Sequence, residues 1–222
     1  MPNPFTDEQV NAAVDFLIES RNKGGLFDAI PETCEPQTLG DGLRISQRLT
    51  ELLNPNRQPA GWKAGGSSPK ALQDSSRDAP PSAPLYPEMI LEHSAELSTA
   101  VYRHCVIEAE FAVVLGCDLP RRDTAYTIDE IREAIVNVHA AIEAPNIRFA
   151  AGRSIGMPSV VADGFAAETL VLGPSVENWH ERDLTTIDIE LLFDGEVVAR
   201  GFEGNDRVDP VSVVHLMAND YS

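Results

Sequence analysis

One apolar run with two acids inside it is the most informative part of this chain: Val106-Ile107-Glu108-Ala109-Glu110-Phe111-Ala112-Val113-Val114-Leu115. Its β-branched and aromatic residues predict a strand in a buried sheet. Because side chains alternate along a strand, Glu108 and Glu110 leave the same face, roughly 6 to 7 Å apart along the backbone. Two like charges on such a face are costly unless a cation lies between them. The pair therefore predicts a site for a hard divalent metal ion.

Composition limits the class of protein. The chain has 222 residues, of which 43% are hydrophobic, and this is enough for one large domain. Its formal net charge is -18, and its 17 lysines and arginines form no cluster that stands out from the acidic background. Such a surface disfavours contact with a phosphate backbone, so we expect no nucleic-acid partner.

The sequence also indicates a cellular compartment. No apolar stretch approaches the ~20 residues that span a bilayer, and the N-terminus lacks a basic segment followed by an apolar signal core. The cysteines Cys34, Cys105 and Cys117 lack the close spacing of zinc or redox motifs. We therefore expect a cytoplasmic protein with reduced thiols and no membrane partner.

The N-terminal part of the chain predicts helices. Thr6 can cap a helix whose apolar positions over residues 10–17 recur at helical spacing. A second apolar stripe runs over residues 39–53 and predicts another helix. The following segment, residues 59–87, is rich in Gly, Ser and Pro and predicts a loop.

In the second half of the chain the pattern is mostly that of strands, interrupted by one helix. The capping-box pattern Thr127-x-x-Glu130 begins this helix, and its apolar face continues to Ile135 and Val138. After the helix, residues 140–149 can be extended, because the proline within them disfavours helix.

A hairpin is predicted near the end of the chain, where Asp194-Gly195 separates the alternating run 186–193 from the strand 196–199. Together these elements predict an α+β fold with a mostly antiparallel or mixed sheet. We expect a helical region over residues 1–60 and a β-rich, metal-binding region over residues 61–222, within one continuous domain.

Landmarks of a known family occur in order over nearly the whole chain. They are Asp41-Gly42-Leu43, Gly61-Trp62-Lys63-Ala64-Gly65, Leu85-Tyr86-Pro87-Glu88-Met89, the run from Ile107 to Gly116, Ala141-Ile142-Glu143-Ala144-Pro145-Asn146-Ile147-Arg148, Val161-Ala162-Asp163, Leu172-Gly173, Asp209-Pro210 and Leu216-Met217-Ala218-Asn219. By their order and spacing, the chain resembles the fumarylacetoacetate hydrolase superfamily. Within it, the resemblance is to the branch of 2-keto-4-pentenoate hydratases and 4-oxalocrotonate decarboxylases.

This resemblance implies a site and its residues. A divalent ion, Mg²⁺ or Mn²⁺, would be held by Glu108, Glu110 and Glu143 and would chelate a small 2-oxo acid. Lys63 would lie at the substrate, either as a proton shuttle or as the cation that holds the substrate carboxylate. Arg148 would brace the acids or pair with substrate, and we favour bracing.

The resemblance also implies a fold and an activity. The fold would be a mixed β-roll of the fumarylacetoacetase C-terminal type with N-terminal helices, here without the usual C-terminal strands after residue 219. A second copy of the chain could cover the open sheet edge, so we expect a homo-oligomer. The activity would be that of a lyase, a hydratase of a 2-oxo or 2-hydroxy-dienoate acid such as 2-hydroxypenta-2,4-dienoate in aromatic catabolism.

Three departures from the family pattern keep other functions open. Pro81 stands where hydratases commonly carry an acid, Asn146 replaces an aspartate, and Ala166 replaces a serine. These changes reduce the polarity expected of the pocket. Decarboxylation of a 2-oxo diacid of the 4-oxalocrotonate type is one alternative. A catalytically weakened homologue that only binds an oxo acid is another.

Overall fold

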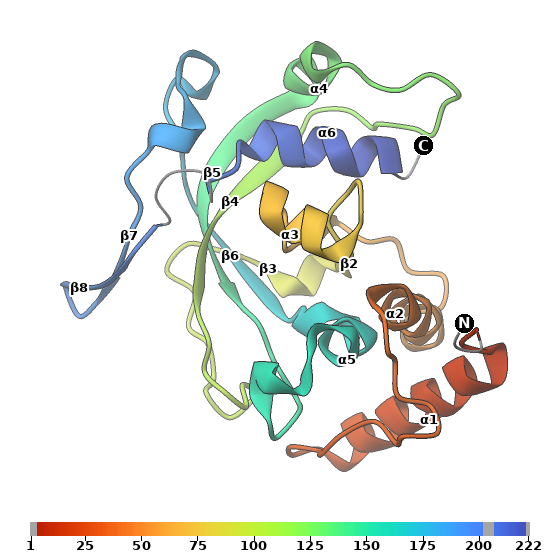
Figure 1. Cartoon of the computed structure of the whole chain (residues 1–222). Coiled ribbons are helices and arrows are strands. Elements are labelled where there is room, and N and C mark those ends of the chain that lie inside the picture. The colour runs from red at the N-terminus through yellow and green to blue at the C-terminus, as the bar shows by residue number, and fades with distance from the viewer. Residues whose placement is uncertain (1–3, 202–206, 221–222) are drawn as a thin grey trace.

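The computed structural model describes residues 4–201 and 207–220. Its helices are α1 (Asp7–Lys23), α2 (Leu39–Leu53), α3 (Pro69–Ser75), α4 (Ile128–Ala134), α5 (Met157–Ala162) and α6 (Pro210–Asp220). Its strands are β1 (Gly61–Ala64), β2 (Ser82–Leu85), β3 (Ile90–Glu92), β4 (Glu108–Leu115), β5 (Ile135–Ala144), β6 (Thr169–Ser175), β7 (Glu190–Phe193) and β8 (Glu196–Arg200). Short 3-10 turns are η1 (Pro87–Met89), η2 (Gly152–Ile155), η3 (Gly164–Ala166), η4 (Trp179–Glu181) and η5 (Leu184–Thr186). The predicted α+β class is confirmed (Figure 1).

The central sheet has the strand order β3-β6-β5-β4. Strand β5 runs antiparallel to both β4 and β6, whereas β3 is parallel to β6, so the sheet is mixed. In Figure 1 the long strands β4 and β5 curve along one side of the molecule, and α3, α5 and α6 lie on the inner side of this curve. The short pair β1-β2 forms a separate sheet, and it brings the Gly61–Ala64 segment to the site.

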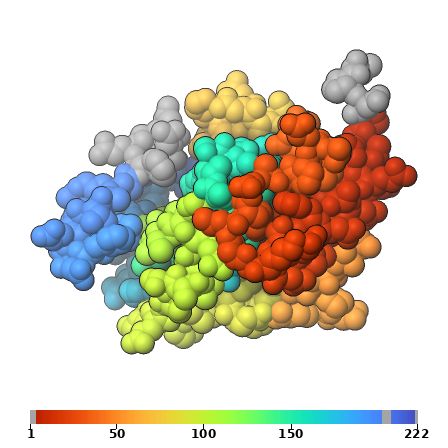
Figure 2. Space-filling model, turned by 90° about the horizontal axis from the view of Figure 1, so that it is seen from below, coloured from red at the N-terminus to blue at the C-terminus, as the bar shows by residue number. Residues whose placement is uncertain are grey.

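The two N-terminal helices form as predicted. The hydroxyl of Thr6 accepts a hydrogen bond from the backbone N–H of Gln9 at 3.2 Å and completes a capping box at the start of α1. Such a cap typically contributes about 1 kcal/mol. The apolar faces of α1 and α2 bury Leu17 and Ile45 against Phe149, which follows β5 in the chain. Figure 2 shows these helices in red and orange at one end of the molecule and the β7–β8 region in blue at the other.

The helix predicted after Thr127 is shorter than expected. Helix α4 ends at Ala134, and Ile135 and Val138 lie in β5, so the prediction for these two residues is wrong. Their β-branched side chains favour extended backbone, and pairing with β4 supplies the hydrogen-bond partners that a helix would otherwise give them. The extended segment predicted from residue 140 forms the second half of this strand.

The loop predicted over residues 59–87 is also wrong in part, because β1, α3 and β2 lie within it. The sequence at the start of α3 is typical of a helix N-terminus. The hydroxyl of Ser68 accepts a hydrogen bond from the backbone N–H of Ala71 at 3.2 Å, and Pro69 occupies the first helical position. The two strands are four residues each, too short for a clear alternation.

The predicted hairpin is confirmed at its turn. Asp194 and Gly195 both have positive φ angles, 51° and 85°, as a two-residue turn of this type requires. Strand β7 begins only at Glu190, later than predicted, and Thr186 belongs to η5, which begins where the Asp183 carboxylate accepts hydrogen bonds from Thr185. Within residues 4–201 and 207–220, no helix combines the length and the apolar character needed to cross a bilayer.

Candidate metal centre

Three glutamates meet on one face of the β4–β5 pair. In the antiparallel register, Glu108 lies directly opposite Glu143, and Glu110 lies opposite Ala141. Alternate residues of one strand share a face with the residues directly opposite them, whose Cβ atoms lie about 5 Å away. One carboxylate oxygen from each of Glu108, Glu110 and Glu143 lies within 4.8 Å of the other two. The structure therefore brings the three predicted metal ligands together.

This cluster of acids is costly without a cation. Glu143 is 2% exposed. Within the described residues, its two carboxylate oxygens and Oε1 of Glu108 are buried and accept no well-oriented hydrogen bond. Burial and then the negative charge of Glu143 raise the pKa of Glu110 to about 7, while the positive charge of Lys63 acts in the opposite direction. Carboxylates this close favour either protonation of one of them or the binding of a cation.

Lys63 is the cation at the buried end of the cluster. It lies in β1, where the antiparallel pairing with β2 sets it opposite Ala83. Its Nζ lies 2.6 Å from Oε1 of Glu143, and the two side chains are 9% and 3% exposed. This contact is an ion pair by distance, without the orientation of a good hydrogen bond. The predicted catalytic lysine therefore touches one of the predicted metal ligands.

A second cation, Arg153, lies at the other end of the cluster, and sequence reasoning missed it. Its guanidinium forms an ion pair with Oε1 of Glu108, and the two side chains are 60% and 29% exposed. Arg153 belongs to η2, within a loop that carries no recognisable motif. The contact depends on how this loop packs against the end of β4. No local sequence pattern predicts that packing.

Arg148 does not contact the three glutamates in this structure. Its guanidinium donates to Oδ2 of Asp163 at 3.2 Å and to Oε2 of Glu168 at 2.7 Å. Asp163 is almost fully buried and also accepts from Nε of Arg21 at 2.8 Å. These contacts join α1, the segment after β5 and the turn after α5. Any effect of Arg148 on the metal centre would therefore pass through this ionic network.

The residue at position 146 fits its surroundings as an asparagine. The side-chain amide of Asn146 donates to the carbonyl of Val101 and to Oε2 of Glu168, both at 3.1 Å. Its Oδ1 accepts from the backbone N–H of Arg103 at 3.3 Å. An aspartate here would set a second carboxylate beside that of Glu168. The departure from the family pattern is thus explained by hydrogen bonding around Asn146.

The donor set suits a hard divalent ion. It consists of carboxylate oxygens alone, which Mg²⁺, Mn²⁺ and Ca²⁺ prefer over softer metals. The buried oxygens without hydrogen-bond partners are the atoms that an ion would satisfy. Three acids from two paired strands would hold such an ion with few protein ligands, which would suit the binding of a chelating substrate. The residues present therefore fit the implied metal.

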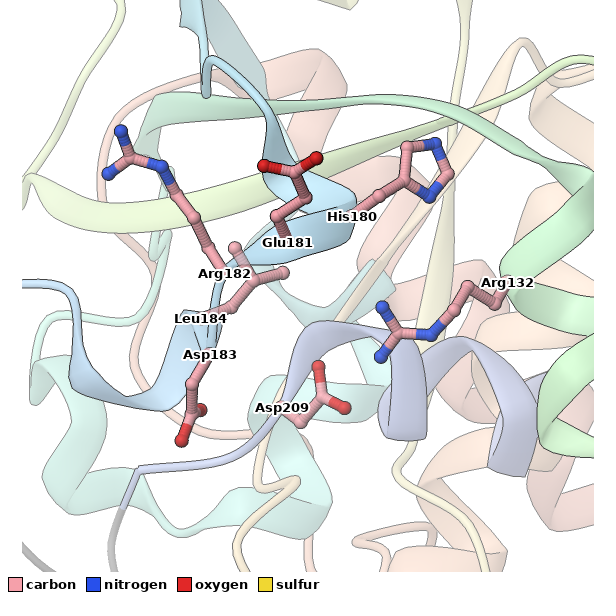
Figure 3. Close-up of a pocket in the computed structure, with 7 residues that line it drawn as sticks. All are labelled: Arg132, His180, Glu181, Arg182, Asp183, Leu184 and Asp209. Atoms are coloured by element: carbon pink, nitrogen blue, oxygen red, sulfur yellow. The ribbon is translucent and has the colours of Figure 1, made fainter.

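A separate hollow lies away from these glutamates. It has a volume of about 370 Å³ and is lined by Arg132, His180, Glu181, Arg182, Asp183, Leu184 and Asp209. Figure 3 shows the guanidinium of Arg132 directed toward the carboxylate of Asp209 across this hollow. The carboxylate of Asp209 accepts from the backbone N–H of Val211 and so caps α6. Acids and bases are mixed around the hollow, and no predicted site residue lines it.

Comparisons with known proteins bear on the whole chain. No family model matches it. Over 196 residues it is 26% identical to a 2-keto-4-pentenoate hydratase of Burkholderia vietnamiensis strain G4, a match that covers 88% of this chain and 74% of the relative. Over 219 residues it is 24% identical to a protein of the same name from Paraburkholderia xenovorans strain LB400, covering 98% and 80% of the two chains.

Two solved structures have a fold similar to that of this chain. The chain superimposes with a TM-score of 0.76 on 4-oxalocrotonate decarboxylase from Pseudomonas putida G7 complexed with calcium and acetate, at 21% identity over 96% of this chain and 80% of that chain. The TM-score is 0.75, at 22% identity, for the same enzyme complexed with magnesium and adipate. The fold expected from the sequence landmarks is thus confirmed.

Proposed function

Because the chain falls in the 2-keto-4-pentenoate hydratase and 4-oxalocrotonate decarboxylase branch of the fumarylacetoacetate hydrolase superfamily, we propose that it is a metal-dependent hydro-lyase. Its substrate would be a small 2-hydroxy-dienoate or 2-oxo acid, such as 2-hydroxypenta-2,4-dienoate from aromatic catabolism. The convergence of Glu108, Glu110 and Glu143, with Lys63 against Glu143, is the observation that carries the proposal. The cofactor would be Mg²⁺ or Mn²⁺.

The proposed roles of the side chains follow from their positions. Glu108, Glu110 and Glu143 would hold the ion, which when bound supplies a Lewis acid and a template for a 2-oxo carboxylate. Lys63 carries its donors at Nζ, beside Glu143, where it can bind an anionic oxygen of the substrate or pass a proton. Arg148 stays a proposed brace, since it holds Asp163 and Glu168.

The reaction requires two proton movements and one water. The proton of the 2-hydroxyl group leaves and a proton is added at carbon 5, which converts the dienol into a 2-oxo-3-enoate. Water then adds across the remaining double bond, with its hydroxyl at carbon 4 and its proton at carbon 3. A group that can donate and accept near the oxo acid is needed, and Lys63 is the proposed group because its side chain is buried at the cluster.

The test follows the ultraviolet absorbance of 2-hydroxypenta-2,4-dienoate with purified protein and Mg²⁺ or Mn²⁺. We expect metal-dependent loss of the conjugated chromophore, and we expect Lys63→Met to reduce the rate by about a hundredfold, the scale of general acid–base catalysis. Lys70→Met is the matched control, since Lys70 lies on α3 with its side chain 75% exposed. Binding of the dienoate without any turnover would contradict the proposal of an enzyme. It would favour the alternative of a catalytically weakened homologue that only binds an oxo acid.

Decarboxylation is the second candidate, and the solved structures named 4-oxalocrotonate decarboxylase are the observation that favours it. Such a reaction would break a carbon–carbon bond, release CO₂ and place a proton on the carbon that loses it. Parallel assays with the dienoate and with 4-oxalocrotonate separate the two candidates. Release of CO₂ from the diacid, with no hydration of the dienoate, would replace the first proposal by the second.

We also propose a cytoplasmic homo-oligomer. The β7–β8 hairpin exposes four large apolar side chains, those of Leu192, Phe193, Val197 and Val198, which are 42 to 51% exposed. A two-stranded hairpin is marginally stable alone, and pairing with a second copy would cover this surface. Light scattering coupled to size-exclusion chromatography measures the mass, and the mass of one chain would contradict the proposal.

A further inference from the structure

A left-handed turn follows α5 and places one aromatic ring beside Lys63. Gly164, Phe165 and Ala166 have φ angles of 72°, 54° and 55°. For residues with a side chain this conformation is strained. Two successive strained residues persist only where the surrounding structure holds them. The contacts around the turn must therefore stabilise this conformation.

Both ends of this turn are fixed by hydrogen bonds. Before it, the guanidinium of Arg21 donates to the backbone carbonyl of Asp163 at 2.9 Å, and Arg148 holds the carboxylate of the same residue. After it, the carbonyl of Ala166 accepts from the backbone N–H of Asn146 at 2.9 Å. The strained backbone between these contacts is thus held in one conformation.

The ring that this turn presents touches Lys63. Phe165 is 7% exposed, and the centre of its ring lies 4.6 Å from Nζ of Lys63. The same Nζ lies 2.6 Å from Oε1 of Glu143. Gly65, two residues after the lysine, is needed here, because a Cβ at this position would come within 2.7 Å of the ring carbon Cζ of Phe165.

We infer that Phe165 is a positioning residue for Lys63, an inference that rests on the function proposed above for this site. The aromatic face and the Glu143 carboxylate both contact the ammonium group and together hold it beside the three glutamates. Phe165 would act on the metal centre through its contact with this lysine. The strain in the turn is offset by this contact and by the hydrogen bonds at its two ends.

A purely structural role is the competing explanation, since Phe165 also packs with Ile147, Val160 and Val161. Phe165→Leu keeps an apolar side chain and removes the aromatic face. Phe149→Leu is the matched control, because Phe149 is 1% exposed and packs in another cluster of the core. Leucine is preferred to tyrosine at position 165, since tyrosine keeps the aromatic face and adds a hydroxyl group at Cζ, the ring atom nearest to the place of a Cβ at Gly65.

The first experiment needs neither metal nor substrate. The chain has three lysines, Lys23, Lys63 and Lys70, so a protein labelled with ¹³C at lysine Cε gives three resonances. We expect the ring current of Phe165 to shift the Lys63 signal, assigned with Lys63→Met, away from the other two. Phe165→Leu should abolish this shift and Phe149→Leu should keep it. An unchanged Lys63 signal in Phe165→Leu would overturn the inference.

The second experiment measures the binding of oxalate, a mimic of the oxo-acid end, by calorimetry with Mg²⁺ present. We expect Phe165→Leu to weaken oxalate binding about tenfold, while Mg²⁺ affinity changes by less than about twofold. In the Lys63→Met background, Phe165→Leu should add less than about twofold, because its effect passes through the lysine. Equal weakening in both backgrounds, or none in either, would overturn the inference. If the wild-type chain binds no oxalate, the proposed function fails, and the Lys63 resonance alone decides the inference.

Discussion

The two ends of the glutamate cluster differ in how firmly the protein holds them. At one end, Glu143 and Lys63 are buried, and Phe165 covers the lysine. At the other end, Glu108 and Arg153 lie toward solvent, with side chains 29% and 60% exposed. Both ends therefore pair a carboxylate with a cation, but in surroundings of very different polarity. An ion pair in the interior is strong and costly to disrupt, whereas an exposed pair contributes little.

This difference suggests that the two ends of the proposed site have different roles. At the buried end, Glu143 and Phe165 already contact Lys63, so we expect a ligand there to lose little free energy to ordering of the protein. At the exposed end, Arg153 can leave Glu108 at small cost, which would free that carboxylate for an ion and open a path for a substrate. The predictions that follow change one end at a time.

The largest effect is expected from Glu143→Gln. We expect this change to weaken Mg²⁺ binding by at least about a hundredfold, since it removes the buried ligand whose oxygens have no other well-oriented partner. Glu108→Gln, at the exposed end, should weaken binding by only about tenfold. The measurement is the Mg²⁺-dependent rise in melting temperature, which should disappear in Glu143→Gln.

Glu130→Gln is the control for this experiment, because Glu130 pairs with Arg122 and not with a member of the cluster, and its side chain is 43% exposed. Its Mg²⁺-dependent shift should equal that of the wild type. A Glu143→Gln protein that keeps the full shift would show that these acids are not the metal site, and equal losses in Glu143→Gln and Glu108→Gln would remove the distinction between the two ends.

The second prediction concerns the support of the buried end. We expect Arg148→Gln to lower the free energy of unfolding by about 2 kcal/mol, because it breaks charged hydrogen bonds to Asp163 and Glu168. Urea denaturation measures this loss. Arg44→Gln removes an exposed pair with Asp7 and should cost less than about 0.5 kcal/mol. An Arg148→Gln protein of unchanged stability that no longer binds oxalate would instead assign Arg148 to the substrate.

How much of this site the sequence predicts depends on whether the signal is local. Glu108 and Glu110 share a strand, so alternation alone places them on one face. Glu143 lies far along the chain, and its position opposite Glu108 requires the register of β5, which the overlong helix prediction at Ile135 obscured. The family resemblance supplied Glu143 and Lys63 where periodicity could not.

For the fold, too, elements with a local sequence signal were predicted and elements defined by long-range pairing were missed. The helices α1 and α2 were predicted because apolar residues recur at helical spacing within each segment, and for α1 also because Thr6 caps it. The short strands β1 and β2 were missed, since four residues of each are defined by their pairing with one another. Arg153 and Phe165 were missed as contacts for the same reason, because each reaches the site from a turn whose place is set by tertiary packing.

The third prediction uses the acidity of the cluster between its two ends. Burial and the charge of Glu143 raise the pKa of Glu110 to about 7. An ion requires the ionised acid, so Mg²⁺ affinity should fall by about tenfold for each pH unit below 7. Calorimetry of Mg²⁺ binding at pH 6 and pH 8 in buffers of different ionisation enthalpy should detect release of a proton at the lower pH. Equal affinity at both would contradict the prediction.

The same group should change the stability of the metal-free protein with the opposite sign. A raised pKa in the folded state means that folding takes up a proton between the ordinary pKa of Glu110, 4.5, and its raised value of about 7. This contribution is fully present below 4.5 and is lost as the pH rises through 7. Relative to Glu110→Gln, the wild type without metal should therefore lose stability across this window. Parallel pH dependence in the two proteins would contradict this assignment.

The smallest effect is expected at the exposed end. Arg153→Gln removes the cation that pairs with Glu108, and the Arg153 side chain is 60% exposed. Because exposed ion pairs contribute about 0 to 1 kcal/mol, stability should change by less than that amount. Mg²⁺ affinity should rise by about twofold, since the ion no longer displaces Arg153 from the carboxylate. Lys63→Met, at the buried end, should differ from Arg153→Gln. Any rise in its Mg²⁺ affinity should come with a clear loss of stability of the metal-free protein. A large loss of Mg²⁺ affinity in Arg153→Gln would show instead that Arg153 orders Glu108 for the ion, and the exposed end would then be as firmly built as the buried one.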